Sequence, residues 1–168
     1  VENAAETLLE VSHAIHGKPE LAFEEHFACA LLSETLRDHD LNVETGVYSL
    51  ETAFETTINS ERDGPTVAVL AEYDALPQIG HACGHNIIAT TALGATLALN
   101  AVAQSLPGRV KLLGTPAEER GGGKELMARA GAFEGIDAAL MIHPAGVNLA
   151  TMPSICVAEV EVVYHGCL

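Results

Sequence analysis

Basic residues are scarce in this 168-residue sequence, which has eight Lys and Arg against 23 Asp and Glu and a formal net charge of −15. A surface with that balance repels the phosphates of nucleic acids and anionic lipids. We therefore expect neither nucleic acid nor a membrane as a partner, and bound cations could offset part of the charge. Trp is absent, and only four Phe and three Tyr occur, so the core must be formed mainly by Ala, Leu and Val.

Cysteines are few and widely spaced. The four of them form no C-x-x-C pair: Cys29, Cys83, Cys156 and Cys167. This pattern fits free thiols in a reducing compartment better than a disulfide framework, so we expect a cytoplasmic protein. No apolar run reaches the roughly 18 residues of a membrane span. The sequence starts at Val1 rather than Met, which leaves open a leader removed before this residue.

The apolar residues that are present suffice for a folded domain, since they make up 48% of the sequence. Their spacing predicts alternating helices and strands, which are typical of an α/β domain with a largely parallel sheet. The expected helices cover residues 4–16, 20–39, 87–103 and 124–130. The expected strands cover residues 42–48, 53–59, 66–71, 109–114, 138–142 and 155–164, and those at 66–71 and 138–142 are expected to be buried.

Side chains with metal-ligand chemistry follow three of these strands. The carboxyl ends of strands in open α/β sheets are where ligands bind, so we expect these side chains to converge. Together they offer the Cys, His and Glu donors that suit zinc and its first-row neighbours. They are Glu72, Asp74 and the stretch Gly80-His81-Ala82-Cys83-Gly84-His85-Asn86 after the first strand, Glu118-Glu119 after the second, and His143 after the third.

The adjacent pair Glu118-Glu119 points to hydrolytic chemistry. Neighbouring side chains point in different directions, so one glutamate can bind metal while the other takes a proton from a water. Two other interpretations involve nearby residues. Cys83 could act as a nucleophile with His81 or His85, whereas Gly121-Gly122-Gly123-Lys124 lacks the spacing and the following Ser or Thr of a phosphate loop.

The motifs in combination resemble the aminoacylase/carboxypeptidase-type metallopeptidases, and most closely the branch of p-aminobenzoyl-glutamate hydrolases and auxin-conjugate amidohydrolases. The resemblance rests on Gly80 to Asn86, Thr115-Pro116-Ala117-Glu118-Glu119 and Ile142-His143-Pro144, with support from Tyr73-Asp74-Ala75-Leu76-Pro77 and His16-Gly17-Lys18-Pro19-Glu20-Leu21. Asn86 stands where many relatives have Asp, although the p-aminobenzoyl-glutamate branch tolerates Asn there. The resemblance thus spans nearly the whole chain.

This resemblance implies two divalent metal ions, with zinc favoured by the Cys donor and manganese, cobalt or nickel left open. It implies Cys83, His85, Glu119 and His143 as metal ligands and Glu118 as general base. Asp74 resembles the family's aspartate that supports a ligand. Glu72 stands where more distant relatives carry a metal-binding His, and we expect that role to have passed to the cysteine motif. His81 either orients the ligand turn or only packs there.

The resemblance also implies a three-layer α/β/α zinc-peptidase-like catalytic domain over residues 1–154 and the entry to a lid and dimerisation domain at 155–168. The rest of the lid and a further His ligand would lie outside these residues, so the 168 residues alone should hold an incomplete site. The implied activity is hydrolysis of amide or peptide bonds in N-acyl amino acids, aminobenzoyl-glutamate-like conjugates or dipeptides, by an enzyme that forms homodimers through its lid. The alternative is a non-catalytic relative that acts as a peptide-binding or partner subunit.

Overall fold

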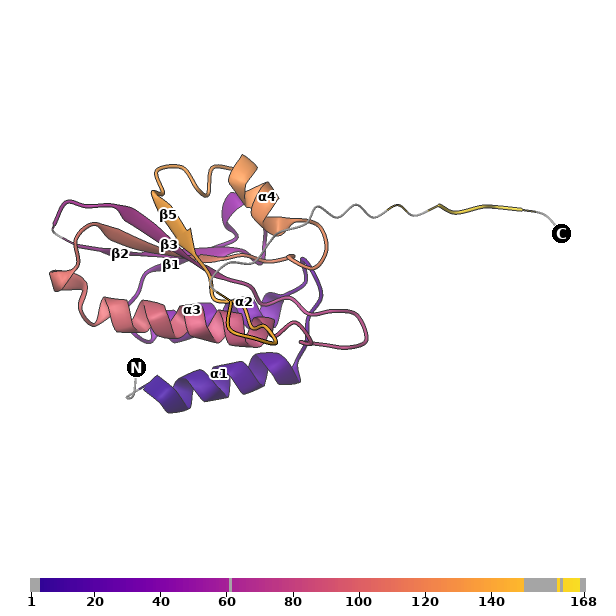
Figure 1. Cartoon of the computed structure of the whole chain (residues 1–168), viewed down its shortest axis with the longest axis horizontal. Coiled ribbons are helices and arrows are strands. Elements are labelled where there is room, and N and C mark those ends of the chain that lie inside the picture. The colour runs from indigo at the N-terminus through magenta and orange to yellow at the C-terminus, as the bar shows by residue number, and fades with distance from the viewer. Residues whose placement is uncertain (1–3, 61, 150–159, 161, 167–168) are drawn as a thin grey trace.

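The computed structural model describes residues 4–60, 62–149, 160 and 162–166. Helices and strands alternate along this part of the chain, which confirms the predicted α/β class (Figure 1). The elements are α1 (Ala5–Gly17), α2 (His26–Arg37), β1 (Val43–Thr45), the 3₁₀ helix η2 (Val47–Ser49), β2 (Phe54–Asn59), β3 (Thr66–Ala71), α3 (His85–Asn100), the 3₁₀ helix η3 (Ala103–Ser105), β4 (Arg109–Gly114), α4 (Gly123–Arg129) and β5 (Ala138–Leu140).

The strands form one sheet in the order β1-β2-β4-β3-β5. β3 pairs in parallel with both β4 and β5, whereas β2 is antiparallel to its neighbours β1 and β4. Four of the five described strands therefore run in one direction. The register pairs Ala71 with Gly114, so β3 and β4 end at the same level and the residues after them leave the sheet side by side.

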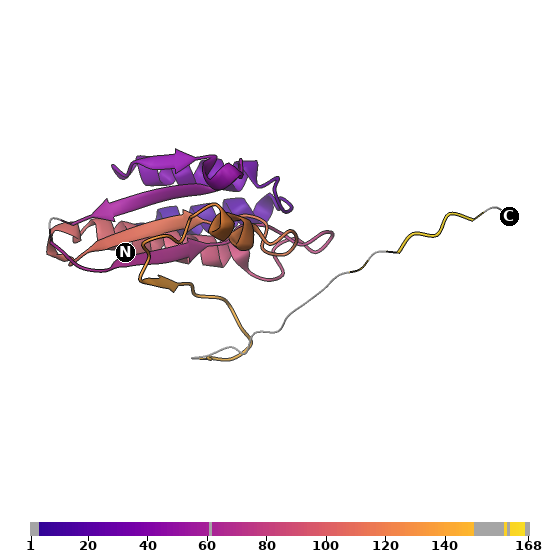
Figure 2. The same cartoon turned by 90° about the horizontal axis from the view of Figure 1, so that it is seen from above.

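Helices cover both faces of the sheet. α1, α2 and α3 lie on one face and α4 lies on the other (Figure 1, Figure 2). α3 contacts β3 and β4, and α1 packs against α3 rather than against the sheet itself. Within the sheet, Gly114 of β4 makes room for the ring of its register partner Phe54 of β2: a Cβ on Gly114 would lie 2.2 Å from this ring, which is fully buried and stacked on Tyr73 with ring centroids 5.9 Å apart.

Most predicted elements are confirmed, and the strands at 66–71 and 109–114 have the predicted bounds. α2, however, begins at His26 rather than near residue 20. The carboxylate of Glu20 accepts the N–H groups of Phe27 and Ala28, both at 3.0 Å, so Glu20 satisfies the first turn of α2 instead of belonging to it. β1 is also shorter than predicted, because Gly46 adopts a left-handed conformation and turns the chain into η2.

The last strands differ from the prediction. β5 is exposed along its length, not buried, since among the described strands it pairs only with β3. Of the strand predicted at 155–164, residues 155–159 and 161 lie outside the described residues, as does the predicted domain boundary at 154–155. Val160 and residues 162–164 are exposed and form no strand. None of the helices in the described ranges combines the length and the apolar character needed to cross a bilayer.

Candidate metal centre

The sheet delivers the candidate residues to one edge, as the sequence predicted. Glu72 and Asp74 follow β3, and Glu118 and Glu119 follow β4, whose last residue is in register with that of β3. His143 follows the parallel strand β5. The carboxyl ends of parallel strands therefore bring together side chains that are far apart in the sequence.

His85 lies at the start of α3, directly after Gly84. Gly84 has a φ of +78°, and a Cβ at this position would lie only 2.9 Å from Cγ of Pro144. A glycine is therefore required both by the left-handed backbone and by the close approach. The turn places His85 in the first turn of α3, where its side chain is 1% exposed.

Asp74 orients the ring of His85 and also holds the loop after β4. Its Oδ1 lies 2.9 Å from Nδ1 of His85, and its Oδ2 accepts the N–H of Glu119 at 2.8 Å. Burial raises the pKa of Asp74, but these hydrogen bonds outweigh it and hold the pKa below its usual value. Because Nδ1 of His85 donates to an ionised carboxylate, Nε2 is the ring nitrogen available to a metal.

Three carboxylates surround Nε2 of His85. The distances from this nitrogen are 3.3 Å to Glu72 Oε2, 3.6 Å to Glu119 Oε1 and 3.8 Å to Glu118 Oε2. Burial lowers the pKa of His85, but Asp74, Glu72 and Glu119 outweigh it and raise the pKa above its usual value. Three of the atoms are buried with no hydrogen-bond partner in the described part of the chain: Glu72 Oε2, His85 Nε2 and Glu119 Oε1.

Two groups of donor atoms converge here, each with its members within 4.8 Å of one another: Cys83, His85 and Glu119 in one, and Glu72, His85 and His143 in the other. Buried polar atoms without partners are costly. Thiol, imidazole and carboxylate are the donors that divalent first-row ions accept. The residues present therefore fit a metal site, and all four ligands that the resemblance implied belong to these groups.

Cys83 lies close to negatively charged side chains, which affect the protonation of its thiol. Interaction with the Glu119 carboxylate, then burial and further negative charges, raises the pKa of the Cys83 thiol to about 11. A nucleophilic cysteine needs the opposite, a lowered pKa beside a positive group. The geometry therefore argues against the thiol-nucleophile alternative, and a bound cation would favour the thiolate instead.

His143 brings the second imidazole to the site. Its ring lies edge-on to that of His85, with centroids 5.9 Å apart. Its Nδ1 lies 2.7 Å from the carbonyl oxygen of Pro144, an arrangement that places the ring proton on Nδ1 and leaves Nε2 as a donor to metal. His143 is exposed, whereas His85 is buried.

The loop that carries the glutamate pair is held in an uncommon conformation. Ala117, just before Glu118, has a φ of +58°, which non-glycine residues adopt rarely. Its N–H donates to Oε1 of Glu25 at 2.8 Å, and the fully buried Glu25 also accepts the hydroxyl of Thr52 at 2.8 Å. Both carboxylates reach Nε2 of His85 from this loop, but the side chain of Glu118 is 40% exposed and that of Glu119 only 15%.

Glu118 faces a large cavity of about 1080 Å³. Burial and the neighbouring negative charges raise the pKa of Glu118, with the charge of Glu72 next in importance after burial. The cavity is also lined by Glu72, Lys124 and His143. Lys124 donates to the second carboxylate oxygen of Glu72, Oε1. The site thus opens onto a space that can hold a small molecule.

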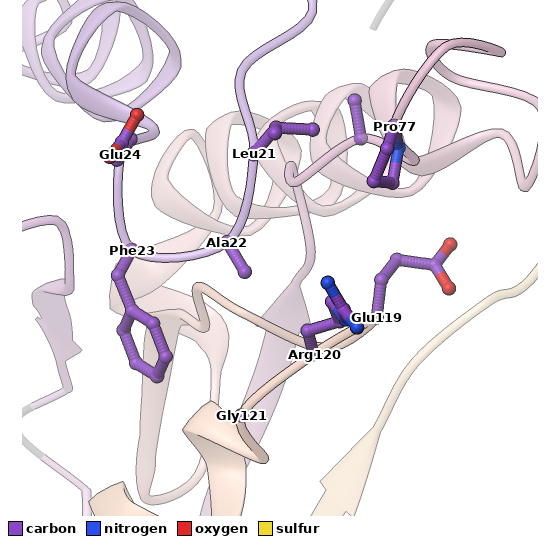
Figure 3. Close-up of a pocket in the computed structure, with 9 residues that line it drawn as sticks. Leu21, Ala22, Phe23, Glu24, Pro77, Glu119, Arg120 and Gly121 are labelled. Atoms are coloured by element: carbon purple, nitrogen blue, oxygen red, sulfur yellow. The ribbon is translucent and has the colours of Figure 1, made fainter. Parts of the chain in front are cut away.

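A second cavity, of about 310 Å³, is lined in part by Glu119 (Figure 3). Leu21, Ala22 and Pro77 give it apolar walls, and Glu119 and Arg120 contribute charged side chains to its lining (Figure 3).

His81 and Asn86 complete the description of the cysteine motif. His81 is buried against His16, with ring centroids 6.3 Å apart, which favours the packing role over the orienting one. Asn86 donates from Nδ2 to Oγ of Ser12 at 3.0 Å. It therefore ties α3 to α1.

Two acidic residues stand out in the structure beyond the site residues expected from the sequence. The sequence assigns no metal role to Glu72, yet the carboxylate of Glu72 lies closest of the three to Nε2 of His85 and is 2% exposed. Glu25 was not singled out at all. Its neighbours gave no signal, because Glu24 and His26 on either side of it are exposed and Phe23 is 40% exposed.

An α/β sheet with thiol, imidazole and carboxylate groups gathered at the carboxyl ends of its parallel strands is typical of metal-binding α/β catalytic domains. Residues 68–166 match the sequence profile of Peptidase family M20/M25/M40. The chain belongs to this family, as its motifs had indicated.

The relatives include enzymes of several substrate types. The Xaa-Arg dipeptidase of Mus musculus is 43% identical, over 99% of this chain and 41% of its own length. One of the subunits of the p-aminobenzoyl-glutamate hydrolase from Escherichia coli is 31% identical, over 86% of this chain and 34% of its own length. The chain thus spans less than half the length of these curated relatives.

The solved structures agree with the fold. A structure from Bacillus subtilis, described as a dinuclear metal binding peptidase from the M20 family, superimposes with a TM-score of 0.76 and 26% identity. The match covers 83% of this chain and 43% of the other. A structure from methicillin-resistant Staphylococcus aureus, described as a putative aminohydrolase, has a TM-score of 0.74 and 29% identity, over 82% of this chain and 39% of the other.

Proposed function

We propose that this chain supplies the core of a metal-dependent hydrolase that cleaves amide or peptide bonds of small substrates. The observation that carries the proposal is the cluster of carboxylates around Nε2 of His85, at 3.3 to 3.8 Å, with its buried and unpartnered atoms. The names of the relatives support it: dipeptidase, p-aminobenzoyl-glutamate hydrolase and N-acetyl-L-cysteine deacetylase.

The proposed ligands are Cys83, His85, Glu119 and His143, holding two divalent ions, of which zinc suits the Cys donor best. The dinuclear relative from Bacillus subtilis supports the number of ions. When bound, such ions would polarise the substrate carbonyl and make a water more acidic. Asp74 would keep the ring of His85 in the tautomer that leaves Nε2 free.

Glu118 is the proposed general base. Its side chain faces the large cavity and is more exposed than that of Glu119, so it can reach both a water and a substrate. It would accept a proton from the attacking water and pass the proton to the departing amine. Burial and neighbouring negative charges raise the pKa of Glu118, in the direction that suits a group that takes up and then releases a proton.

The proposed substrates are dipeptides, N-acyl amino acids and aminobenzoyl-glutamate-like conjugates. A cavity of about 1080 Å³ has room for molecules of that size. As further parts of the proposal, the full-length protein would be a homodimer through a lid domain and would work in a reducing compartment such as the cytoplasm. Cys29 and Cys83 are free thiols, in keeping with the second point.

The test separates the two adjacent glutamates in the full-length protein. Glu118→Gln should keep its bound metal and lose about 10²–10⁴-fold in kcat, because only the base is removed. Glu119→Gln should lose metal, because an anionic donor is removed. Metal content and steady-state kinetics are measured on both variants, with Glu125→Gln, an exposed glutamate paired with Arg129, as the matched control.

Three outcomes would contradict the proposal. Near-normal kcat in metal-replete Glu118→Gln would remove the base assignment, and the reverse pattern of metal loss would show that the two roles are exchanged. Metal binding by the wild type without turnover of any acyl amino acid or dipeptide would favour the non-catalytic alternative. Activity that survives removal of metal by a chelator would favour a thiol enzyme.

A further inference from the structure

We infer that Glu72 is a metal ligand in its own right, that it shares an ion with His85 and His143, and that Lys124 positions its carboxylate. The inference rests on the proposed function and adds a donor to the set above. It also reverses the expectation from the sequence that the role of this position had passed to the cysteine motif.

The number of donors leads to Glu72 first. The two convergent groups of donors overlap at His85, which has only Nε2 to offer because Nδ1 is held by Asp74 at 2.9 Å. Catalytic zinc sites typically use about three protein ligands per ion. Two such sites need about six protein donors, so Cys83, His85, Glu119 and His143 leave room for Glu72 beside the further His ligand that the resemblance places outside these residues.

The position of Glu72 fits a ligand. Its Oε2 is buried and lies 3.3 Å from Nε2 of His85. Neither of these two atoms has a hydrogen-bond partner among the described residues. Two donors that are each about 2.0–2.1 Å from a tetrahedral ion lie about 3.3–3.4 Å apart. The spacing of these two atoms is therefore that of two ligands on one ion, and His143 offers the third donor within 4.8 Å.

Lys124 accounts for the orientation of the carboxylate. It reaches Glu72 from α4, on the opposite face of the sheet from α3 (Figure 1), and donates to Oε1 only. The other oxygen, Oε2, is thereby directed at His85. Ligating carboxylates are commonly hydrogen-bonded through the oxygen that does not bind metal. A simple structural ion pair between Glu72 and Lys124 would not require Oε2 to remain unpartnered.

The experiment counts ions. The full-length protein is stripped with a chelator and titrated with Zn²⁺, with stoichiometry and affinity measured by calorimetry and by elemental analysis after desalting. Wild type and the control Glu125→Gln should each bind two ions. Glu72→Gln should bind one ion, or bind one of the two ions much more weakly. Removing a residue that only supports a ligand lowers metal affinity about 10–100-fold, so the loss in Glu72→Gln should exceed this range.

Two further variants separate a ligand from a residue needed for folding. Glu72→Asp keeps the charge but withdraws the carboxylate by one methylene, so it should fold like wild type, as judged by thermal unfolding of the metal-free protein, and still bind the affected ion more weakly. Lys124→Met should retain two ions, with affinity for one lowered about 10-fold. Co²⁺ in place of Zn²⁺ adds a spectroscopic readout, since the visible absorption of one equivalent should change in Glu72→Asp.

The outcomes distinguish this inference from the proposed function. Two ions bound with wild-type affinity by both Glu72→Gln and Glu72→Asp would overturn the inference and leave the proposed function intact. Fewer than two ions in the wild type would overturn both the two-ion proposal and the inference.

Discussion

Replacing Asp74 by Asn tests whether the site is built around this carboxylate. Both of its oxygens accept hydrogen bonds, from Nδ1 of His85 at 2.9 Å and from the N–H of Glu119 at 2.8 Å. An amide offers only one acceptor, so in Asp74→Asn one of the two donors must face an NH₂ group. The variant keeps the size of the side chain and removes one hydrogen bond together with the negative charge.

The expected cost follows from these contacts. A lost hydrogen bond to a charged group is worth about 1.5–3 kcal/mol. The loss of a residue that supports a metal ligand lowers metal affinity about 10–100-fold, or about 1.4–2.8 kcal/mol. The first figure applies to the stability of the fold and the second to the binding of metal. We therefore expect Asp74→Asn to fold, to bind metal about 10–100-fold more weakly, and to recover part of its activity at high metal concentration.

The assay is a metal titration of the stripped full-length protein, followed by kcat at saturating metal. Asp137→Asn is the matched control, because Asp137 also accepts a backbone N–H, that of Thr66 at 2.8 Å, but at the opposite end of β3. It should leave metal affinity unchanged. Wild-type affinity in Asp74→Asn would refute the reasoning, since it would mean that neither hydrogen bond contributes to the metal site.

Three other predictions follow from single contacts. Cys83→Ser should lower metal content and hydrolysis, because a hydroxyl is a poor replacement for a thiolate, and wild-type values in elemental analysis would contradict this. Burial raises the pKa of Glu25, so the protonated side chain stabilises the fold fully below the unfolded pKa, and this contribution is lost as the pH rises through the folded pKa. In urea titrations, the free energy of unfolding of Glu25→Gln relative to wild type should therefore increase between pH about 4 and about 7. A constant difference would argue against this. Gly114→Ala places a Cβ 2.2 Å from the ring of Phe54 and should cost about 1–3 kcal/mol of stability in the same titrations, whereas an unchanged midpoint would show that the ring can move aside.

The strands next to the site were predictable because their signal is local. A continuous apolar run between turn residues set the bounds of β3 and β4, and the chemical residues after them were visible as motifs. The convergence of Cys83, His85, Glu119 and His143 followed from the rule that the carboxyl ends of parallel strands share an edge. The convergence of these four side chains could therefore be predicted without knowing any distance between them.

The remaining features depend on contacts that sequence spacing does not encode. Glu20 satisfies the first turn of α2 from seven residues before Phe27, so helical periodicity alone placed the start of α2 too early. Glu25 and Glu72 look like surface residues in the sequence, and only the structure shows their burial among partners 92 and 52 residues away, respectively. β5 is apolar but exposed in the described part of the chain, where it pairs only with β3. The apolar composition of a strand does not show how many neighbouring strands it has, so the prediction of a buried strand was wrong.

The contact between Gly84 and Pro144 has a consequence for which ions the protein can accept. These two residues each adjoin an imidazole of the site, and a Cβ at Gly84 would already lie 2.9 Å from the proline ring. This close approach sets the minimum separation of the two segments, and with it the minimum separation of the two histidines. Zinc donors lie at about 2.0–2.2 Å and calcium donors at about 2.3–2.6 Å. Zinc therefore needs its donors closer together than calcium does, and the missing side chain at Gly84 is what lets the two segments approach; any side chain at this position would hold the two histidines further apart.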